Sequence, residues 1–295
     1  MIGLAVGSVL AFSTWSGGQG TGPQPRPVSL DALHRLPPVN AAVYAWDPAG
    51  ARITLAEQRL TVACMARHKL SYRPAEPATE ADVEWPTPFG RESLAPHSAR
   101  SRDGTEPSTG HNPAYGRTLL GDPDKQITAH GERLSVSAPA VGCLAEAEQR
   151  MLGNQRARWM RLQILLQEAQ QDTLEMVTRD RQFRAANARW SACMHQEGFD
   201  FASPAELVAH AQSAKGMSDG RLPLTDVRCK ERDDYLTVAY TRLALFQRRW
   251  LTRHPDVLRD RARLLRRQDA VARALLGSVT GHSDSASGPN PTAAR

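Results

Sequence analysis

Residues 59–72 read RLTVACMARHKLSY, and residues 189–201 read RWSACMHQEGFDF. When Cys64 is aligned with Cys193, Cys-Met recurs, and a segment with an aromatic residue follows at the same distance in both stretches. Each stretch comes after a sequence with helical spacing and before a polar segment that contains proline. The chain therefore carries two divergent copies of one unit, and this repeat sets the expected architecture.

Each copy has a second cysteine, which opens a further predicted helix: Cys143 in VGCLAEAEQR and Cys229 in VRCKERDDYL. If each copy closes its own loop, the disulfides are Cys64–Cys143 and Cys193–Cys229. Four cysteines allow three pairings, so this choice depends on the repeat and not on spacing. In the chain-entropy model each closure contributes roughly 3–5 kcal/mol to stability.

Two other states of the cysteines stay open at this point, namely unpaired buried thiols and a structural zinc site. Cys64 and His68 lie one helical turn apart, and His195 is close to Cys193 in the sequence. However, the chain has no CxxC motif, and the ligands would have to converge from four separate segments, which is unusual for structural zinc. We therefore expect paired cysteines and no metal or other cofactor.

The two copies differ at the end of the helix that carries Cys-Met. Lys69 stands where the second copy has Gly198. A glycine at that position is typical of a helix that ends in the left-handed conformation. Its absence predicts a less regular helix end in the first copy.

A mainly all-α fold is predicted, in which long antiparallel helices form a bundle or a hairpin. Only 6% of the residues are aromatic, which argues against an all-β fold. Apolar residues follow steps of three and four from Trp159 to Met194, as in a heptad seam. We expect the aromatic residues with this spacing to lie in the core and not in a ligand box: Trp159, Phe183, Trp190 and Trp250. The predicted helices span about 54–67, 143–196 with a kink at Gly153, 226–253 and 255–276.

Residues 73–140 contain nine prolines and interrupt this regularity as an irregular insertion, with a short hairpin expected near 126–136. Binding groups often lie on such loops, so the candidate site is placed here. The candidate residues are Arg91, Glu92, His97, His111, Tyr115 and Arg117.

The ends of the chain have compositions that differ from the folded part. An apolar run from Ile2 to Phe12 resembles a secretory signal or a truncated membrane anchor. The segments that follow from composition are a signal-like segment over 1–16, a linker over 17–29, a first helix-cysteine unit with the insertion over 30–150, a second unit with the C-terminal helices over 151–276, and a disordered tail over 277–295.

The net charge of +6 favours anionic neighbours, such as a cell-surface polymer or a membrane surface. The most basic stretch is RDRARLLRRQDAVAR (259–273), but aspartates alternate with its arginines and no stacking aromatics accompany it. Nucleic acid is therefore a disfavoured partner. The sequence also lacks GxxxxGK[ST], HExxH, an EF-hand loop and GxGxxG, which argues against the common catalytic and phosphate sites. The segment GMSDG (216–220) matches GxSxG by its letters, but no strand is expected before it, as a nucleophile elbow requires.

The pair ACMARHKLSY and ACMHQEGFDF, each with a distant partner cysteine, resembles a group of uncharacterised exported proteins that are common in actinobacteria, many of them lipoproteins. The resemblance covers most of residues 40–250 and implies an extracytoplasmic location with paired cysteines. The chain departs from the lipoprotein members because no cysteine lies in its apolar leader, and it departs from the motif at Lys69.

Three functions compete on this basis. The leading hypothesis is a non-enzymatic binding or scaffold protein outside the cytoplasm, secreted or associated with a membrane, which presents the 73–140 insertion on a disulfide-stapled helical frame. The second is an enzyme with a site around His97 and His111. The third is a cytosolic helical protein that binds nucleic acid through 259–273.

Overall fold

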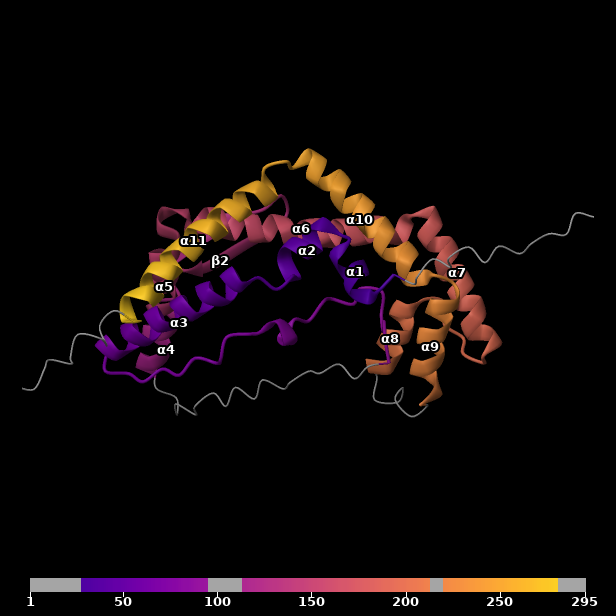
Figure 1. Ribbon diagram of the computed structural model, residues 1–295, viewed down its shortest axis with the longest axis horizontal. Helices are drawn as coiled ribbons and strands as arrows, with labels where there is room; N and C mark the ends of the chain where they lie inside the picture. The colour runs from indigo at the N-terminus through magenta and orange to yellow at the C-terminus, as the bar shows by residue number, and fades with distance from the viewer. Residues whose placement is uncertain (1–27, 95–112, 213–219, 281–295) are drawn as a thin grey trace, which may run out of the picture.

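The computed structural model describes residues 28–94, 113–212 and 220–280, and the fold is mainly α-helical, as predicted (Figure 1). The signal-like segment, most of the linker, most of the tail, and residues His97 and His111 lie outside the described residues. The helices are α1 (Leu30–Arg35), α2 (Pro38–Tyr44), α3 (Pro48–Arg67), α4 (Pro113–Leu120), α5 (Cys143–Leu152), α6 (Arg156–Arg179), α7 (Arg181–Gln196), α8 (Pro204–Gln212), α9 (Arg221–Arg232), α10 (Tyr235–Arg253) and α11 (Val257–Thr280), with short 3₁₀ turns at Glu80–Asp82 and Gly153–Gln155.

The molecule is elongated, and α6 runs along its middle. Helices α3, α4 and α5 lie at one end and α7, α8 and α9 at the other, while α10 and α11 meet at an apex above α6 (Figure 1). The C-terminal helix α11, which the sequence groups with the second unit, packs against α3 and α5 of the first. Among the described residues, no helix is both long enough and apolar enough to cross a bilayer.

The predicted long helix over 143–196 is broken at two points. At Gly153 the chain takes a positive φ of 61°, so the expected kink is a complete break between α5 and α6. At Asp180 the carboxylate accepts hydrogen bonds from the backbone N–H groups of Gln182 and Phe183 and so caps a new helix, α7. The buried seam shifts just before this second break. Steps of three and four from Trp159 predict that Met176 is buried, but Met176 is 37% exposed and its neighbour Val177 is buried instead.

Aromatic residues with helical spacing lie in the core, as expected. Phe183 and Trp190 pack in the cluster at the α7–α9 end, and Trp250 packs in the cluster between α6 and α11 with Trp159 partly buried beside it. Since these rings belong to two separate clusters, they form no common ligand box.

Three other predicted helices differ from the structure in their bounds or in their continuity. The helix expected from residue 54 begins at Pro48, because Asp47 caps it through the N–H of Ala49. The helix expected over 226–253 is two helices, α9 and α10, which are separated by a turn with Asp234 in the left-handed conformation. Helix α11 continues to Thr280, past the start of the expected tail.

The two copies of the repeat end their Cys-Met helices in the same turn, contrary to the expectation for Lys69. Lys69 has φ +60° and Gly198 has φ +89°. The N–H of Leu70 donates to the carbonyl of Met65 over 3.0 Å, and the N–H of Phe199 donates to that of Met194 over 2.9 Å. The hydrogen bonds of a Schellman-type ending hold Lys69 in a conformation that L residues rarely adopt.

Replacing Lys69 with glycine should therefore stabilise the protein by about 1 kcal/mol, since it removes the left-handed strain. The reverse change, Gly198→Ala, should cost about 1 kcal/mol, because a Cβ at Gly198 meets no atom within 4 Å and only the backbone conformation opposes it. Urea unfolding of both variants measures these effects. An unchanged midpoint for both variants would contradict the shared turn.

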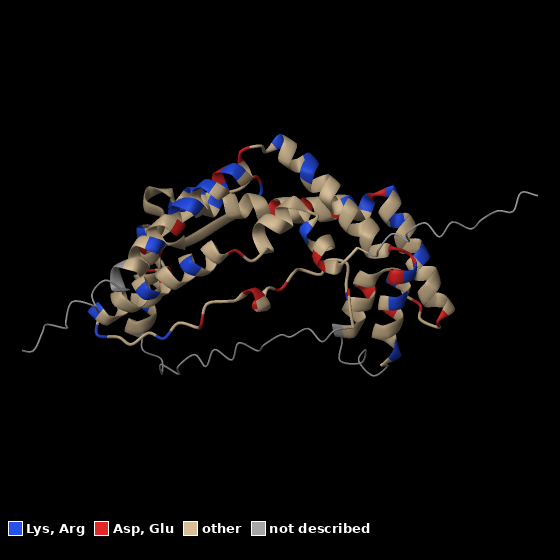
Figure 2. Ribbon diagram, viewed as in Figure 1, with Lys and Arg blue, Asp and Glu red and all other residues tan. Residues whose placement is uncertain are grey.

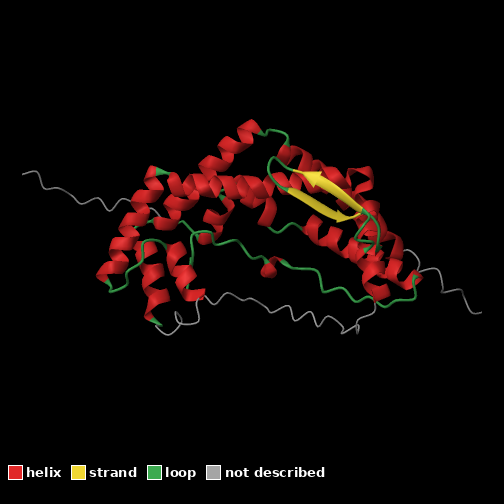
Figure 3. Ribbon diagram, turned by 180° about the vertical axis from the view of Figure 1, so that it is seen from behind, coloured by secondary structure: helices red, strands yellow, loops and turns green. Residues whose placement is uncertain are grey.

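The expected hairpin is present, with β1 (Gln126–His130) antiparallel to β2 (Ser135–Pro139), and it lies along α6 (Figure 3). The buried carboxylate of Glu168 accepts three backbone N–H groups from the turn, those of Glu132, Arg133 and Leu134, at 2.6–2.8 Å. These hydrogen bonds stabilise the charged form and keep the pKa of Glu168 below its usual value, although burial opposes them. Gly131 is required in this turn because a Cβ there would lie 2.5 Å from Glu168 Oε2.

The insertion begins as an extended segment. Together with the three residues before it, this segment spans residues 70–94, and we call it the strap. It runs from the α3–α4 end to the α8–α9 end of the molecule beneath α2 and α3 (Figure 1). Acidic residues occur along it, whereas arginines gather on α11 (Figure 2). The insertion is thus a link between the two units and includes one helix, α4, that its composition does not predict.

Candidate functional site

The cysteines have the pairing that the repeat predicts, Cys64 with Cys143 and Cys193 with Cys229. All four residues are at most 2% exposed. Cys143 is the first residue of α5, as expected, but Cys229 lies inside α9 and does not open it. The first bridge joins α3 to α5 and the second joins α7 to α9, so each fixes a Cys-Met helix to a helix that comes later in the chain.

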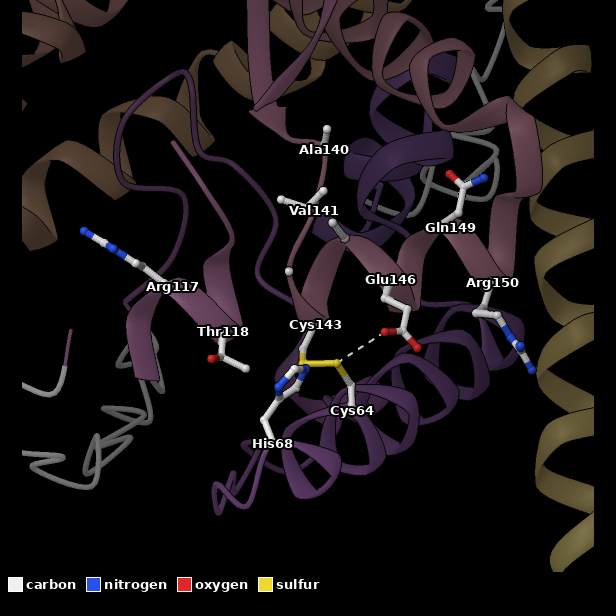
Figure 4. A pocket seen from close by; sticks show the side chains of 12 residues that line it. Cys64, His68, Arg117, Thr118, Ala140, Val141, Cys143, Glu146, Gln149 and Arg150 are labelled. Atoms are coloured by element: carbon white, nitrogen blue, oxygen red, sulfur yellow. Dashed lines mark hydrogen bonds between the residues drawn. A yellow bond between two sulfur atoms is a disulfide. The ribbon is translucent and has the colours of Figure 1, made fainter. Parts of the chain in front are cut away.

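A hollow of about 570 Å³ lies beside the first disulfide (Figure 4). His68 and Glu146 lie close to the sulfur atoms in this view, while Arg117 and Arg150 point away from them. Glu146 Oε2 is 3.4 Å from Cys64 Sγ, and its carboxylate also pairs with Arg67. The pocket therefore presents a disulfide with an imidazole and a carboxylate at its rim.

The residues around the first disulfide include a group that could hold a metal ion if the cysteines were reduced. The candidate ligand atoms of Cys64, His68 and Cys143 all lie within 4.8 Å of one another. Zinc needs the sulfurs as thiolates, and a covalent bond between the two sulfurs removes both negative charges. In the disulfide form these residues do not provide a zinc site.

The candidate residues of the insertion do not converge on one site. Tyr115 packs beside the first disulfide, and Arg117 lines the hollow next to it. Arg91 and Glu92 instead contact α1, α9 and α10 near the other end of the molecule. His97 and His111 lie outside the described residues, so the described part of the insertion holds no assembled catalytic group.

Glu92 is buried in a polar cluster that fastens the end of the strap. Its carboxylate accepts a hydrogen bond of 2.6 Å from the hydroxyl of Tyr240 and lies 2.5 Å from His34 Nε2. Trp85 stacks on His34, with ring centroids 5.5 Å apart, and Phe89 meets Tyr240 edge to face. Burial and the charge of Glu92 raise the pKa of Tyr240, which therefore stays a proton donor.

A second buried cluster next to it contains an ion pair. Lys230 Nζ donates to Asp226 over 3.0 Å and to the backbone carbonyl of Arg91 over 2.6 Å. The other Asp226 oxygen accepts from Trp190 Nε1 over 3.0 Å. Both charged side chains are 1% exposed, so this pair is internal and fixes the strap to α9.

A second hollow, of about 530 Å³, lies where the α2–α3 corner, the strap and α11 meet. Its walls include Tyr44 and Trp46, the small residues Ala42 and Gly50, and the side chain of Arg261 from α11. The guanidinium of Arg261 lies over the Trp159 ring, 5.9 Å from the centroid. Burial lowers the pKa of Arg261, while the charge of Asp47 opposes this effect.

Three of the six arginines in 259–273 pair with carboxylates of the described residues, namely Arg259, Arg263 and Arg273. Asp260 pairs with Arg158 and Arg263, and Asp269 pairs with Arg52 and Arg273. This pairing lowers the pKa of Asp269, because the neighbouring guanidinium groups stabilise its charged form. Half of the arginines on this stretch are thus engaged in ion pairs within the protein.

Glu57 is a half-buried carboxylate without an ion pair among the described residues. Burial and the charge of Glu148 raise the pKa of Glu57 to about 7. A folded-state pKa above the unfolded value gives stability that is complete at low pH and is lost as the pH rises through about 7. Glu57→Gln should therefore leave stability unchanged near pH 4 and raise it by roughly 3 kcal/mol at pH 8. Chemical unfolding at both pH values tests this, with Glu76→Gln on the exposed strap as the control; an equal gain at both pH values would contradict it.

Comparison of the chain with protein-family models, with curated proteins and with solved structures returned no match.

Proposed function

We propose that the protein is a non-enzymatic binding protein that acts outside the cytoplasm, with two disulfide-stapled helical units as its frame. The proposal rests on the observation that the strap is fixed at both ends. Its first end follows directly on α3, which the Cys64–Cys143 disulfide joins to α5, and its other end is held by the clusters of Lys230 and Glu92. An extended segment that is fixed at both ends loses little conformational entropy when it binds a ligand.

Two features support the location. Structural disulfides persist in oxidising compartments and are rare in the cytosol of mesophiles. The apolar leader and the resemblance to exported proteins support export as well.

The location can be tested in the native host by fractionation and by alkylation of thiols before and after reduction. We expect the protein outside the cytoplasm, with no free thiol before reduction. Its intact mass should increase by four hydrogen masses on reduction, two for each bridge. Recovery from the cytoplasm with four free thiols would reject the proposal.

A further inference from the structure

Arg261 is a cation that has no hydrogen-bond acceptor among the described residues. Its guanidinium donates no hydrogen bond to any described residue, and its Nε is buried without a partner. Buried polar atoms are almost always hydrogen-bonded, and a desolvated charge without an acceptor is costly. The stacking on Trp159 offsets only part of this cost.

This guanidinium lines the hollow at the α2–α3 corner, which is large enough for a small molecule. The hollow also contains Asp47, whose Oδ1 caps α3 while the carboxylate remains at the exposed surface. Asp82 lines it as well, with its Oδ2 held by Thr79. Separated charges of both signs therefore face one cavity.

Between these charges the walls are small or aromatic. Ala42, Gly50 and Ala78 leave room, and Tyr44 and the partly exposed Trp46 offer ring surfaces. A ligand that suits these walls has an apolar, preferably planar, side group.

We propose that this hollow binds a small zwitterion of the α-amino-acid type with an apolar side group, its carboxylate on Arg261 and its ammonium on Asp47. A guanidinium matches a carboxylate through two parallel hydrogen bonds, which gives Arg261 the acceptor it lacks. This inference rests on the proposed binding function and names the ligand class for it.

The test is calorimetric titration of the full chain with L-phenylalanine. Two analogues of phenylalanine show what each of its charges contributes to binding. Phenethylamine lacks the carboxylate, and 3-phenylpropionate lacks the ammonium group. We expect phenylalanine to bind at least about tenfold more tightly than either. No binding of phenylalanine up to about 10 mM, or equal binding of either relative, would overturn the proposal.

Variants then locate the site. Arg261→Met should weaken binding of phenylalanine at least about tenfold and should fold, because it removes an unsatisfied buried group. Gly50→Leu should abolish binding by filling the hollow, since a Cβ there meets no atom within 4 Å and leucine suits a helix. Gly116→Leu, at an equally open position in α4, is the matched control.

Unchanged affinity in Arg261→Met or Gly50→Leu, with melting curves like that of the wild type, would place the ligand elsewhere and overturn the assignment. Fractionation and thiol alkylation measure export separately. Loss of phenylalanine binding with correct export would therefore reject the ligand site and leave the location standing.

Discussion

Replacing Lys230 with methionine is expected to destabilise the protein by about 3–5 kcal/mol at neutral pH. The substitution keeps the side-chain volume but leaves the Asp226 carboxylate, which is 1% exposed, with the Trp190 indole as its remaining donor. It also removes the donor to the Arg91 carbonyl. A buried charge without its counter-ion is among the most destabilising defects that one substitution can make.

The pH dependence of this loss identifies its cause. Burial raises the pKa of Asp226 even with Lys230 present, and removal of the ammonium raises it further. Because the folded-state pKa then lies well above the unfolded value, the variant regains stability as Asp226 protonates at low pH. The difference from wild type, measured by urea unfolding, should thus be smaller near pH 4 than at pH 8.

Two further variants make the measurement decisive. Lys125→Met removes an exposed lysine and should change stability by less than about 0.5 kcal/mol. Asp226→Leu combined with Lys230→Met removes both charges and should recover most of the loss. A double variant as unstable as Lys230→Met alone would show that packing, and not the unpaired charge, explains the effect.

Local sequence signals predicted the helical class, the hairpin and the disulfide partners. Trp250 is buried, as its helical spacing indicates. The caps at Asp47 and Asp180 were not predicted, because aspartate occurs at many positions and packing decides which of them begins a helix.

The polar clusters could not be predicted in the same way. Asp226 and Lys230 have the spacing of an ordinary surface ion pair, and only the contact with the strap buries them. Glu92 meets Tyr240 across 148 positions of sequence. Lys69 shows the converse case, in which hydrogen bonds of a repeated turn override the residue's own backbone preference.

Removal of the first disulfide, in the variant Cys64→Ala/Cys143→Ala, is expected to cost about 4.5 kcal/mol in the chain-entropy model. Its bridge spans 79 positions, and the second bridge spans 36, for which the same model gives about 4 kcal/mol. Since the two values are close, unfolding free energies alone do not separate the roles of the two bridges. The residues that surround each bridge predict different roles for them.

Around the first bridge the partly buried residues come from the strap and from α4: Leu70, Tyr72, Tyr115 and Leu119. The bridge joins α3 to α5 and so fixes the surface against which these segments pack. Around the second bridge the neighbours are core residues of α7, α9 and α10, among them Trp190 and Tyr235, which pack without it. Loss of the first bridge should therefore release the start of the strap locally, whereas loss of the second should lower global stability and leave the strap protected.

Limited trypsin digestion of the two double variants distinguishes these outcomes, with the bond between the exposed Lys69 and Leu70, at the start of the strap, as the diagnostic site. Under native conditions we expect cleavage after Lys69 to accelerate in Cys64→Ala/Cys143→Ala and to match wild type in Cys193→Ala/Cys229→Ala. Opening of one segment costs less than opening of the whole fold, so local release appears in digestion before it appears in unfolding. Equal cleavage in both variants would mean that the strap is held by its far end alone, through Lys230 and Glu92. The first bridge would then stabilise the protein only by restricting the unfolded chain.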